Sequence, residues 1–395
     1  MFGDFMRAVV LSGGGSKGAY QIGVWKALRK LKIKYEIVTG TSVGALNGAI
    51  MVQNNYYKAY NLWSNISMDK IFDGKIENYD DTITLYKEYL KNFVKNKGAK
   101  PSGLENIVNE LLNTKNFYKS KINYGLITYN KTNKQPKILQ KKDIPESKLN
   151  DYLIASSAAY PAFSSKEIEG IEFIDGGYYD NTPINLAIDM GADEAIVVDL
   201  TTVGLRKAPK KRIKTIKIKP RNDLGSFLLF DKDLAKRNIK YGYNDAMKVF
   251  NKYEGYKYTF KLHSIEKFKT KYKETFTYTF NKIINSKTAQ ASIAKLLKID
   301  KENNNNKIVD KIILKALEHV GETLSIDDTK IYSLNKYIKL VKKDLNIRKK
   351  YNIKTKGLEI YNLIKEEKYA KVKKEALKKP IDFITALCLY TIDED

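Results

Sequence analysis

Cysteine and histidine are nearly absent from this sequence. Cys388 is the only cysteine among 395 residues, so an internal disulfide and a metal cluster held by several thiolates are both excluded. A lone cysteine is typical of a reducing compartment, and we therefore expect a cytoplasmic protein. The two histidines, His263 and His319, lie in the basic C-terminal region, where we expect surface or packing roles. A Ser-His-Asp triad formed within the first 262 residues is impossible.

Long hydrophobic runs are missing as well. No apolar stretch reaches the roughly 18 residues that a membrane-spanning helix requires. The start of the chain, MFGDFMRAVVL, carries one arginine and leads directly into a strand-like run. It has neither the apolar region nor the small-residue cleavage site of a signal peptide. We therefore expect no transmembrane segment and no secretory leader.

Acidic residues are too few to balance the basic ones. The chain has 71 Lys and Arg against 45 Asp and Glu, a net charge of +26. Such a chain is attracted to anionic surfaces, and the Lys-rich C-terminal helices could bind an anionic membrane peripherally. The lysines are also spread through the whole chain, which fits a compositional bias and a solvated helical domain equally well. No nucleic-acid-binding motif is recognisable, so we expect no nucleic acid partner.

The order of the predicted elements divides the chain into two domains, residues 1–250 and 251–395. The second is Lys-rich and mainly helical, with no role indicated. The first begins with a strand at 6–11, a helix at 19–30 and a strand at 35–39, followed by a tight turn and another helix. Two such units in series predict an α/β fold with a mainly parallel sheet flanked by helices. Further strands are expected at 122–129, 137–139 and 171–177, and a helix at 151–163.

A glycine-rich loop separates the first strand from the first helix. It comprises Gly13, Gly14, Gly15, Ser16, Lys17 and Gly18. The pattern G-x-G-x-x-G fits a dinucleotide site with Glu36 as ribose ligand, but Glu36 stands near the start of the second strand rather than at its end. A phosphate-binding P-loop needs Ser or Thr after the lysine, and here Gly18 follows. A turn that serves only helix–strand packing is a third interpretation.

A second motif between strand and helix favours a fourth interpretation. Gly40, Thr41, Ser42, Val43 and Gly44 form G-x-S-x-G, the context in which a sharp turn exposes a nucleophilic serine. Attack of a serine on an acyl group creates an oxyanion, which backbone N–H groups stabilise. Glycines let successive N–H groups point the same way. We therefore predict that residues 13–18 form the oxyanion hole, with Gly14 and Gly15 as donors, and that Lys17 holds the loop or adds positive potential.

A serine nucleophile needs a base, and with no histidine in this domain the base must be a carboxylate. Asp175 ends the apolar part of the segment at 171–177 and precedes Gly176 and Gly177, which allow a tight turn that aims its side chain. Active-site groups of parallel sheets gather at the ends of strands. Four other aspartates fit this position less well, namely Asp180, Asp189, Asp193 and Asp199. An Asx-turn role is the alternative for Asp175.

Four blocks in this order, GGGSKGAYQIGV, GTSVG, ASSAAYPAF and DGGYYDNTPI, resemble the patatin-like phospholipase family. The resemblance covers roughly residues 6–200. It implies a three-layer sandwich and a lipid acyl hydrolase that uses a Ser–Asp dyad, here Ser42 and Asp175, without a metal or other cofactor. The implied substrate is an acyl lipid. A dinucleotide-binding protein and a non-catalytic binding protein with a basic interaction tail remain the alternatives.

An aromatic-rich segment at 51–120 follows the first two strand–helix units. Its large apolar residues could form part of an acyl pocket or a lid, or could simply belong to the core. These residues are Trp63, Ile71, Phe72, Tyr86, Tyr89 and Phe93.

Overall fold

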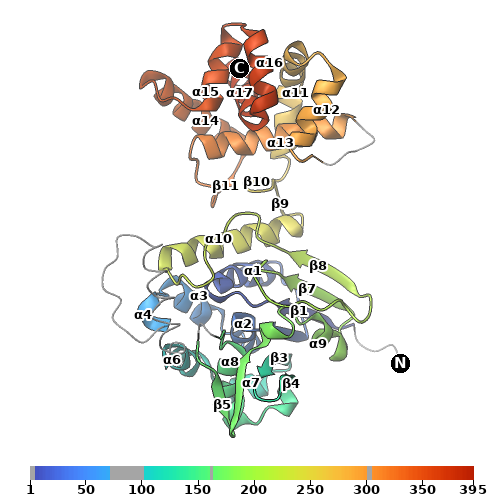
Figure 1. The fold of residues 1–395 in the computed structure, drawn as a ribbon, viewed down its shortest axis with the longest axis vertical. Coiled ribbons are helices and arrows are strands. Elements are labelled where there is room, and N and C mark those ends of the chain that lie inside the picture. The colour runs from blue at the N-terminus through green and yellow to red at the C-terminus, as the bar shows by residue number, and fades with distance from the viewer. Residues whose placement is uncertain (1–4, 72–101, 161–162, 300–304) are drawn as a thin grey trace. The chain divides into compact units, whose positions relative to one another are not determined.

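The computed structural model describes residues 5–71, 102–160, 163–299 and 305–395, and divides the chain into two compact units, residues 1–249 and 250–395 (Figure 1). The first unit contains an eight-stranded sheet in the order β5-β6-β3-β2-β1-β7-β8, with β4 paired to β3. The parallel strands are β1 (Arg7–Leu11), β2 (Ile37–Thr41), β3 (Asn123–Asn130), β7 (Glu194–Val198) and β8 (Lys214–Ile218). The predicted mainly parallel sheet is thus confirmed.

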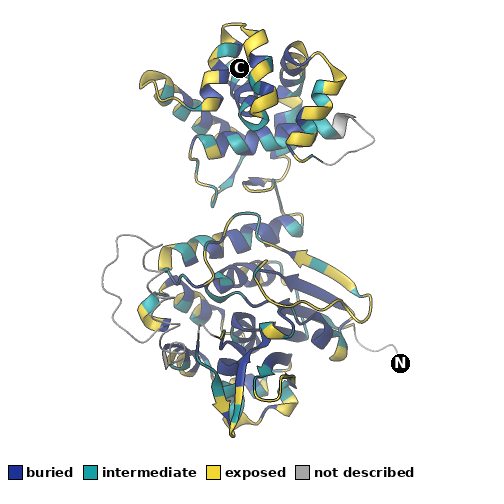
Figure 2. Ribbon diagram, viewed as in Figure 1, coloured by how far each residue is buried: buried dark blue, intermediate teal, exposed yellow. Residues whose placement is uncertain are grey.

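Two strands, β4 and β6, run against this direction, and the edge strand β5 turns back to run with it. β4 (Gln135–Gln140) and β6 (Ile171–Asp175) both pair antiparallel with β3, and β5 (Lys166–Ile168) pairs antiparallel with β6. The central strands β2 and β7 are buried along their whole length, as expected of parallel strands that are covered on both faces. β8, at one edge, is largely exposed (Figure 2).

Helices cover both faces of this sheet. Figure 1 shows α1 (Ala19–Lys30) and α10 (Lys232–Val249) on one face and α9 (Ile184–Asp189) on the other. α9 packs its apolar side on Ala8 and Val10 of β1 and on Val197 of β7. The other α-helices in the described part of this unit are α2 (Val43–Val52), α3 (Tyr56–Ser64), α4 (Met68–Ile71), α6 (Ser102–Leu111), α7 (Thr114–Lys119) and α8 (Leu149–Ser156).

Two predicted elements differ in extent. The helix expected at 151–163 is α8, which begins two residues earlier and ends at Ser156. The strand expected at 35–39 is β2, which is shifted toward the C-terminus and ends at Thr41, immediately before Ser42. α8 therefore ends before the predicted proline stop, whereas β2 extends through Gly40 and Thr41 into the predicted turn.

The second unit is mainly helical, as predicted. Its core surrounds α17 (Pro380–Asp393), in which Phe383, Leu387 and Cys388 are fully buried. The other elements are β9 (Tyr253–Glu254), β10 (Thr259–Lys261), α11 (Ser264–Ile283), α12 (Lys287–Leu296), α13 (Asn305–Thr323), β11 (Ile331–Tyr332), α14 (Leu334–Lys350), α15 (Lys356–Lys365) and α16 (Tyr369–Lys378).

Both histidines belong to this second unit. His319 lies on α13 with its Nδ1 2.8 Å from Thr385 Oγ1, a contact between packed helices, and His263 precedes α11 in a left-handed conformation. Within the part of the chain that the structure describes, no helix combines the length and apolarity needed to cross a bilayer.

Candidate active site

Ser42 occupies the turn between β2 and α2 in a conformation that few residues adopt. Its φ is 57° and its ψ is −131°, outside the regions favoured by L-amino acids. The turn closes only because Gly40 and Gly44 lack side chains. A Cβ at Gly40 would lie 2.2 Å from the Gly44 carbonyl oxygen, and a Cβ at Gly44 would lie 2.3 Å from the Leu11 carbonyl oxygen. The α2 N-terminus, beginning at Val43, therefore meets Ser42 directly and favours negative charge there.

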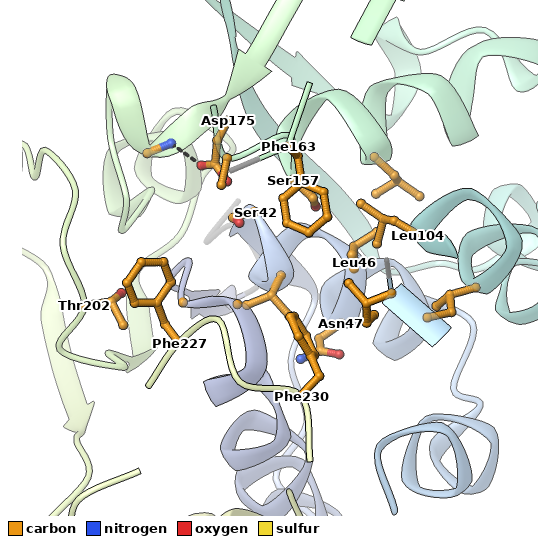
Figure 3. Close-up of a pocket in the computed structure, with 18 of the residues that line it drawn as sticks. Ser42, Leu46, Asn47, Leu104, Ser157, Phe163, Asp175, Thr202, Phe227 and Phe230 are labelled. Carbon is orange, nitrogen blue, oxygen red and sulfur yellow. Dashed lines mark hydrogen bonds between the residues drawn. The ribbon is translucent and has the colours of Figure 1, made fainter. Parts of the chain in front are cut away.

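Three buried hydrogen bonds anchor this strained turn. The Ser42 N–H donates to Ser156 Oγ at 3.0 Å, and the Ser156 hydroxyl donates to the Ile127 carbonyl at 2.7 Å, so α8 and β3 both anchor the turn. The Thr41 hydroxyl donates to the Asp180 carbonyl at 2.8 Å. Because the main chain of Ser42 is fixed from two sides, its side chain is left to face the cavity (Figure 3).

Asp175 faces the same cavity from the end of β6. Its Oδ1 accepts a hydrogen bond from the Gly177 N–H at 2.7 Å, and its carboxylate faces the Ser42 side chain across the same cavity (Figure 3). The residue is only 6% exposed. Burial removes the carboxylate from water and raises its pKa from 3.8 to about 6, although the Ser42 side chain and the Gly177 N–H lower it in part. The structure thus brings together the two residues that the sequence singled out.

The direction of β6, the strand that places Asp175 beside Ser42, differs from the one expected. Asp175 was predicted to end a strand of the parallel set, but β6 is antiparallel to β3 and overlaps only its last residues, with Asp175 opposite Thr128. β3 in turn pairs with β2 so that Ile127 lies opposite Thr41. β6 therefore approaches the carboxyl edge of the sheet from outside, and its end reaches Ser42 from the opposite direction.

The glycine-rich loop lies beside both side chains. Three of its amides are bonded within the protein: Gly13 N–H to the Asn181 carbonyl at 3.1 Å, Ser16 N–H to that of Phe227 at 2.8 Å, and Lys17 N–H to that of Gly14 at 3.2 Å. Within the described residues, the amides of Gly14 and Gly15 donate to no protein acceptor, and both residues line the cavity with Ser42. Two amide donors are therefore left for a bound group.

Gly15 is required by both its conformation and its surroundings. Its φ of 53° is left-handed, and a Cβ there would lie 2.1 Å from the Phe227 carbonyl oxygen. The Lys17 side chain makes no hydrogen bond or ion pair with the residues that the structure describes, so its role in holding the loop stays a prediction.

A chain of buried polar side chains, which the sequence analysis missed, connects the glycine-rich loop to α1 and α2 by hydrogen bonds. Trp63 Nε1 donates to Asn47 Oδ1 at 3.0 Å, and Asn47 Nδ2 donates to the Gly18 carbonyl at 3.1 Å and to Gln21 Oε1 at 2.8 Å. Gln21 Nε2 donates to the Ser12 carbonyl at 2.7 Å. Both ends of the loop are thus fixed to α1 and α2. Polar residues at buried positions of two otherwise apolar helices were the available signal.

The cavity has a volume of about 600 Å³ and a mainly apolar lining. Ser42, Asp175, Gly14 and Gly15 supply polar groups at one region. Helices α2, α3, α4, α6 and α8, and the segment between α3 and α4, supply aliphatic and aromatic side chains. These include Leu46, Ile50, Leu62, Trp63, Ile66, Ile71, Leu104, Ile107, Val108, Leu111 and Leu153. Trp63 and Ile71 therefore do line a pocket, whereas the other four aromatic candidates, Phe72, Tyr86, Tyr89 and Phe93, lie outside the described residues.

The donor set of this cavity does not resemble a metal or dinucleotide site. Across residues 5–71, 102–160, 163–299 and 305–395, no group of three His, Cys, Asp or Glu side chains could hold a metal ion. The Glu36 carboxylate accepts a hydrogen bond from the Arg7 N–H at 2.9 Å, where β1 and β2 begin. Since the glycine-rich loop follows the end of β1, Glu36 lies at the opposite edge of the sheet and cannot serve as a ribose ligand beside it.

Comparisons with known proteins agree with this architecture. Residues 9–188 match the family model of the patatin-like phospholipases. The chain is 29% identical over 216 residues to lysophospholipase NTE1 of Candida albicans and 25% identical over 209 residues to a cUMP-AMP-activated phospholipase of Escherichia coli. These alignments cover 51% and 47% of this chain, but only 14% and 58% of the two relatives.

The solved structure of VipD from Legionella pneumophila was also compared with this chain. It aligns with a TM-score of 0.40 and 15% sequence identity, over 99% of this chain and 91% of that chain. The family match includes the glycine-rich loop, the serine turn and Asp175, all of which surround the cavity. The chain therefore carries a patatin-like phospholipase domain over residues 9–188.

Proposed function

We propose that the N-terminal unit is a serine hydrolase of lipid acyl esters, of the phospholipase A or lysophospholipase type. The observation that carries the proposal is the meeting, at one apolar cavity, of a serine in a strained turn, a buried carboxylate and two unbonded main-chain amides. The family match and the phospholipases among the relatives support a lipid as substrate.

In the proposed mechanism Asp175 is the base and Ser42 the nucleophile. Asp175 takes the Ser42 hydroxyl proton while Oγ attacks the ester carbonyl carbon. The carbonyl oxygen becomes an oxyanion that accepts hydrogen bonds from the amides of Gly14 and Gly15. The C–O bond to the alcohol then breaks, the alcohol leaves with the proton from Asp175, and an acyl-Ser42 remains. Water, deprotonated by Asp175, then attacks the acyl carbon. The bond from that carbon to Ser42 Oγ breaks, Oγ takes the proton from Asp175, and the fatty acid is released.

The apolar part of the cavity supports an acyl chain as the group that is transferred. A chain bound among α2, α3, α6 and α8 would place its carbonyl carbon at the polar end, next to Ser42. The direct test is product analysis by mass spectrometry after the full chain is incubated with a lysophospholipid and with a diacyl phospholipid. We expect free fatty acid from at least one of them. The proposal would be contradicted if the chain cleaved neither of the two lipids and no soluble ester.

The rate of hydrolysis should depend on pH through Asp175. Burial raises the pKa of its carboxyl to about 6, and only the ionised form can accept the serine proton. We therefore expect kcat/KM for p-nitrophenyl butyrate to fall about tenfold per pH unit below about pH 6 and to be constant above about pH 7.

A matched variant identifies the group that titrates. Burial also raises the pKa of Asp180 to about 6, but Asp180 Oδ1 accepts hydrogen bonds from the main-chain N–H groups of Thr182 and Lys207. Asparagine can accept both bonds, so Asp180→Asn should fold and keep the acidic limb. If the limb disappeared in this variant, or if activity were independent of pH between about pH 4.5 and 7, Asp175 would not be the base.

The oxyanion role of the loop predicts a large effect at Gly15. In Gly15→Ala the new Cβ meets the Phe227 carbonyl, so the loop must shift and its free amides move. We expect kcat for the soluble ester to fall by about 100-fold or more. Gly170→Ala is the matched control, because Gly170 also has a positive φ, 78°, but nothing lies within 4 Å of the new Cβ. If Gly15→Ala and Gly170→Ala both folded and had equal kcat values, the oxyanion role of the glycine-rich loop would be refuted.

A further inference from the structure

A short loop after β7 crosses one side of the cavity mouth. We call residues 202–207 the rim loop. The Thr202 hydroxyl donates to the Gly13 carbonyl at 2.7 Å, the Leu205 N–H donates to the Gly177 carbonyl at 3.0 Å, and the Asn181 N–H donates to the Leu205 carbonyl at 2.6 Å. The rim loop is thus bonded to both the glycine-rich loop and the turn that follows Asp175, and its position is fixed.

The apolar side chains of this fixed loop nevertheless point into solvent. Val203 is 90% exposed and Leu205 is 62% exposed, and both line the cavity. Nine large hydrophobic side chains are exposed in the described part of residues 1–249, and five of them line this one cavity. We call these five the mouth cluster: Tyr160, Tyr178, Val203, Leu205 and Phe227. Scattered exposed apolar residues are ordinary, but a cluster of them around a binding site marks an interaction surface.

Basic residues continue directly from the mouth cluster. Residues 201–221 contain nine Lys and Arg and no Asp or Glu. Some of these charges are compensated by acids outside the segment, as in the pairs Arg206–Asp199 and Lys210–Asp189. Lys211 and Arg212 are exposed and extend beyond these pairs. The surface beside the cavity mouth is therefore apolar and cationic at the same time.

We propose that the mouth cluster and residues 206–212 dock on the surface of an anionic phospholipid bilayer. Val203 and Leu205 enter the boundary of the acyl layer, while Lys211 and Arg212 lie among the headgroups. Docking in this orientation presents the cavity mouth to the ester carbonyls of the lipid, so the inference rests on the proposed lipid hydrolase function. A second copy of this chain would bring an equally basic surface and be repelled, and a nucleic acid would leave the apolar side chains exposed.

This surface belongs to the N-terminal unit, whereas the sequence directed attention to the Lys-rich helices of the C-terminal unit. Vesicle co-sedimentation of the full chain distinguishes the two. The protein is the Ser42→Ala variant, which leaves the vesicles intact, and the vesicles are phosphatidylcholine alone or with about one third phosphatidylserine. We expect binding only to the anionic vesicles, with an affinity that falls as salt is added.

Two double variants test the two components of the surface. Val203→Gln with Leu205→Gln should weaken binding by about tenfold or more, and Lys211→Glu with Arg212→Glu should weaken it by a similar factor at low salt. The matched controls are Ile138→Gln, an exposed apolar residue on β4, and Lys336→Glu with Lys339→Glu on α14. Both controls should bind as the parent does, and circular dichroism checks that every variant is folded.

Three results would overturn the docking proposal: binding that ignores the rim variants, binding that is lost in the α14 variant, or a dimer of the chain that the rim variants dissociate. Hydrolysis of p-nitrophenyl butyrate by the wild-type chain is measured in parallel, because a soluble ester needs no bilayer. An active enzyme without vesicle binding refutes docking alone. Vesicle binding that depends on the rim, with no ester cleaved, refutes the proposed function alone.

Discussion

Ser42→Ala should lower ester turnover by at least about 10⁴-fold and abolish covalent labelling by a fluorophosphonate. The variant removes the oxygen that forms the acyl-enzyme, and no neighbouring group on the turn can replace it. The effect should fall on kcat, because the apolar cavity that binds the acyl chain is untouched. Labelling is measured by intact-protein mass spectrometry, and turnover with p-nitrophenyl butyrate.

A second serine in the same cavity supplies the control for labelling. Ser157 Oγ is buried, and it has no hydrogen-bond partner within the described part of the chain. It lacks a carboxylate base, so Ser157→Ala should still be labelled at Ser42 by the fluorophosphonate. Labelling that persists in Ser42→Ala and disappears in Ser157→Ala would transfer the nucleophile to Ser157 and end the assignment made here.

The serine turn could be predicted from sequence because its chemistry is local. One glycine on each side of Ser42, Gly40 and Gly44, is needed for the backbone to pass close beneath it. The strand before the turn and the helix after it are recognisable from their hydrophobic patterns. Asp175 followed by elimination, since no histidine is present in the first unit. The parallel strands were equally legible, because β1, β2 and β7 are short runs of buried apolar residues.

The direction of β6 could not be predicted in the same way. The sequence IEFID is compatible with either direction, and its pairing is decided by how the chain between β3 and β6 returns to the sheet. The argument about parallel strands that led to Asp175 therefore does not apply to its strand, although the residue lies beside Ser42 in the cavity.

Residues that act through distant partners were also missed. Gln21, Asn47 and Ser156 support the site by hydrogen bonds to atoms 9 to 114 positions away in the chain. Phe227 and Leu205 contact the glycine-rich loop and the turn after Asp175 through main-chain hydrogen bonds, which leave no signature in side-chain type. Such contacts depend on tertiary packing, so no local sequence pattern predicts them.

Asp175→Asn should lower kcat for the soluble ester by about 10³-fold, because an amide cannot accept the serine proton. The fold should be retained, since the asparagine Oδ1 can still accept the Gly177 N–H. Asp189→Asn serves as the matched control: Asp189 is part of an exposed ion pair with Lys210, far from the chemistry. An Asp175→Asn variant with wild-type kcat would show that another group is the base.

The same substitution should make the N-terminal unit more stable at neutral pH. Burial raises the folded-state pKa of Asp175 from 3.8 to about 6, so its carboxyl favours folding while protonated, and this contribution is lost as the pH rises through 6. The ionised group then costs about 3 kcal/mol relative to the neutral one, at about 1.4 kcal/mol per unit of pKa. Asparagine is neutral at every pH, and Asp175→Asn should therefore exceed wild type by up to about 3 kcal/mol in free energy of unfolding above about pH 7.

Urea unfolding followed by tryptophan fluorescence measures this difference in the right unit, because Trp25 and Trp63 are the only tryptophans and both belong to the N-terminal unit. The gain should shrink as the pH falls and vanish near about pH 4, where wild-type Asp175 is protonated in the folded state. Asp189→Asn should show no such gain at neutral pH. If Asp175→Asn lost both activity and stability, the folded state would stabilise the ionised carboxylate. The charge of Asp175 would then not lower the free energy of unfolding in exchange for a base.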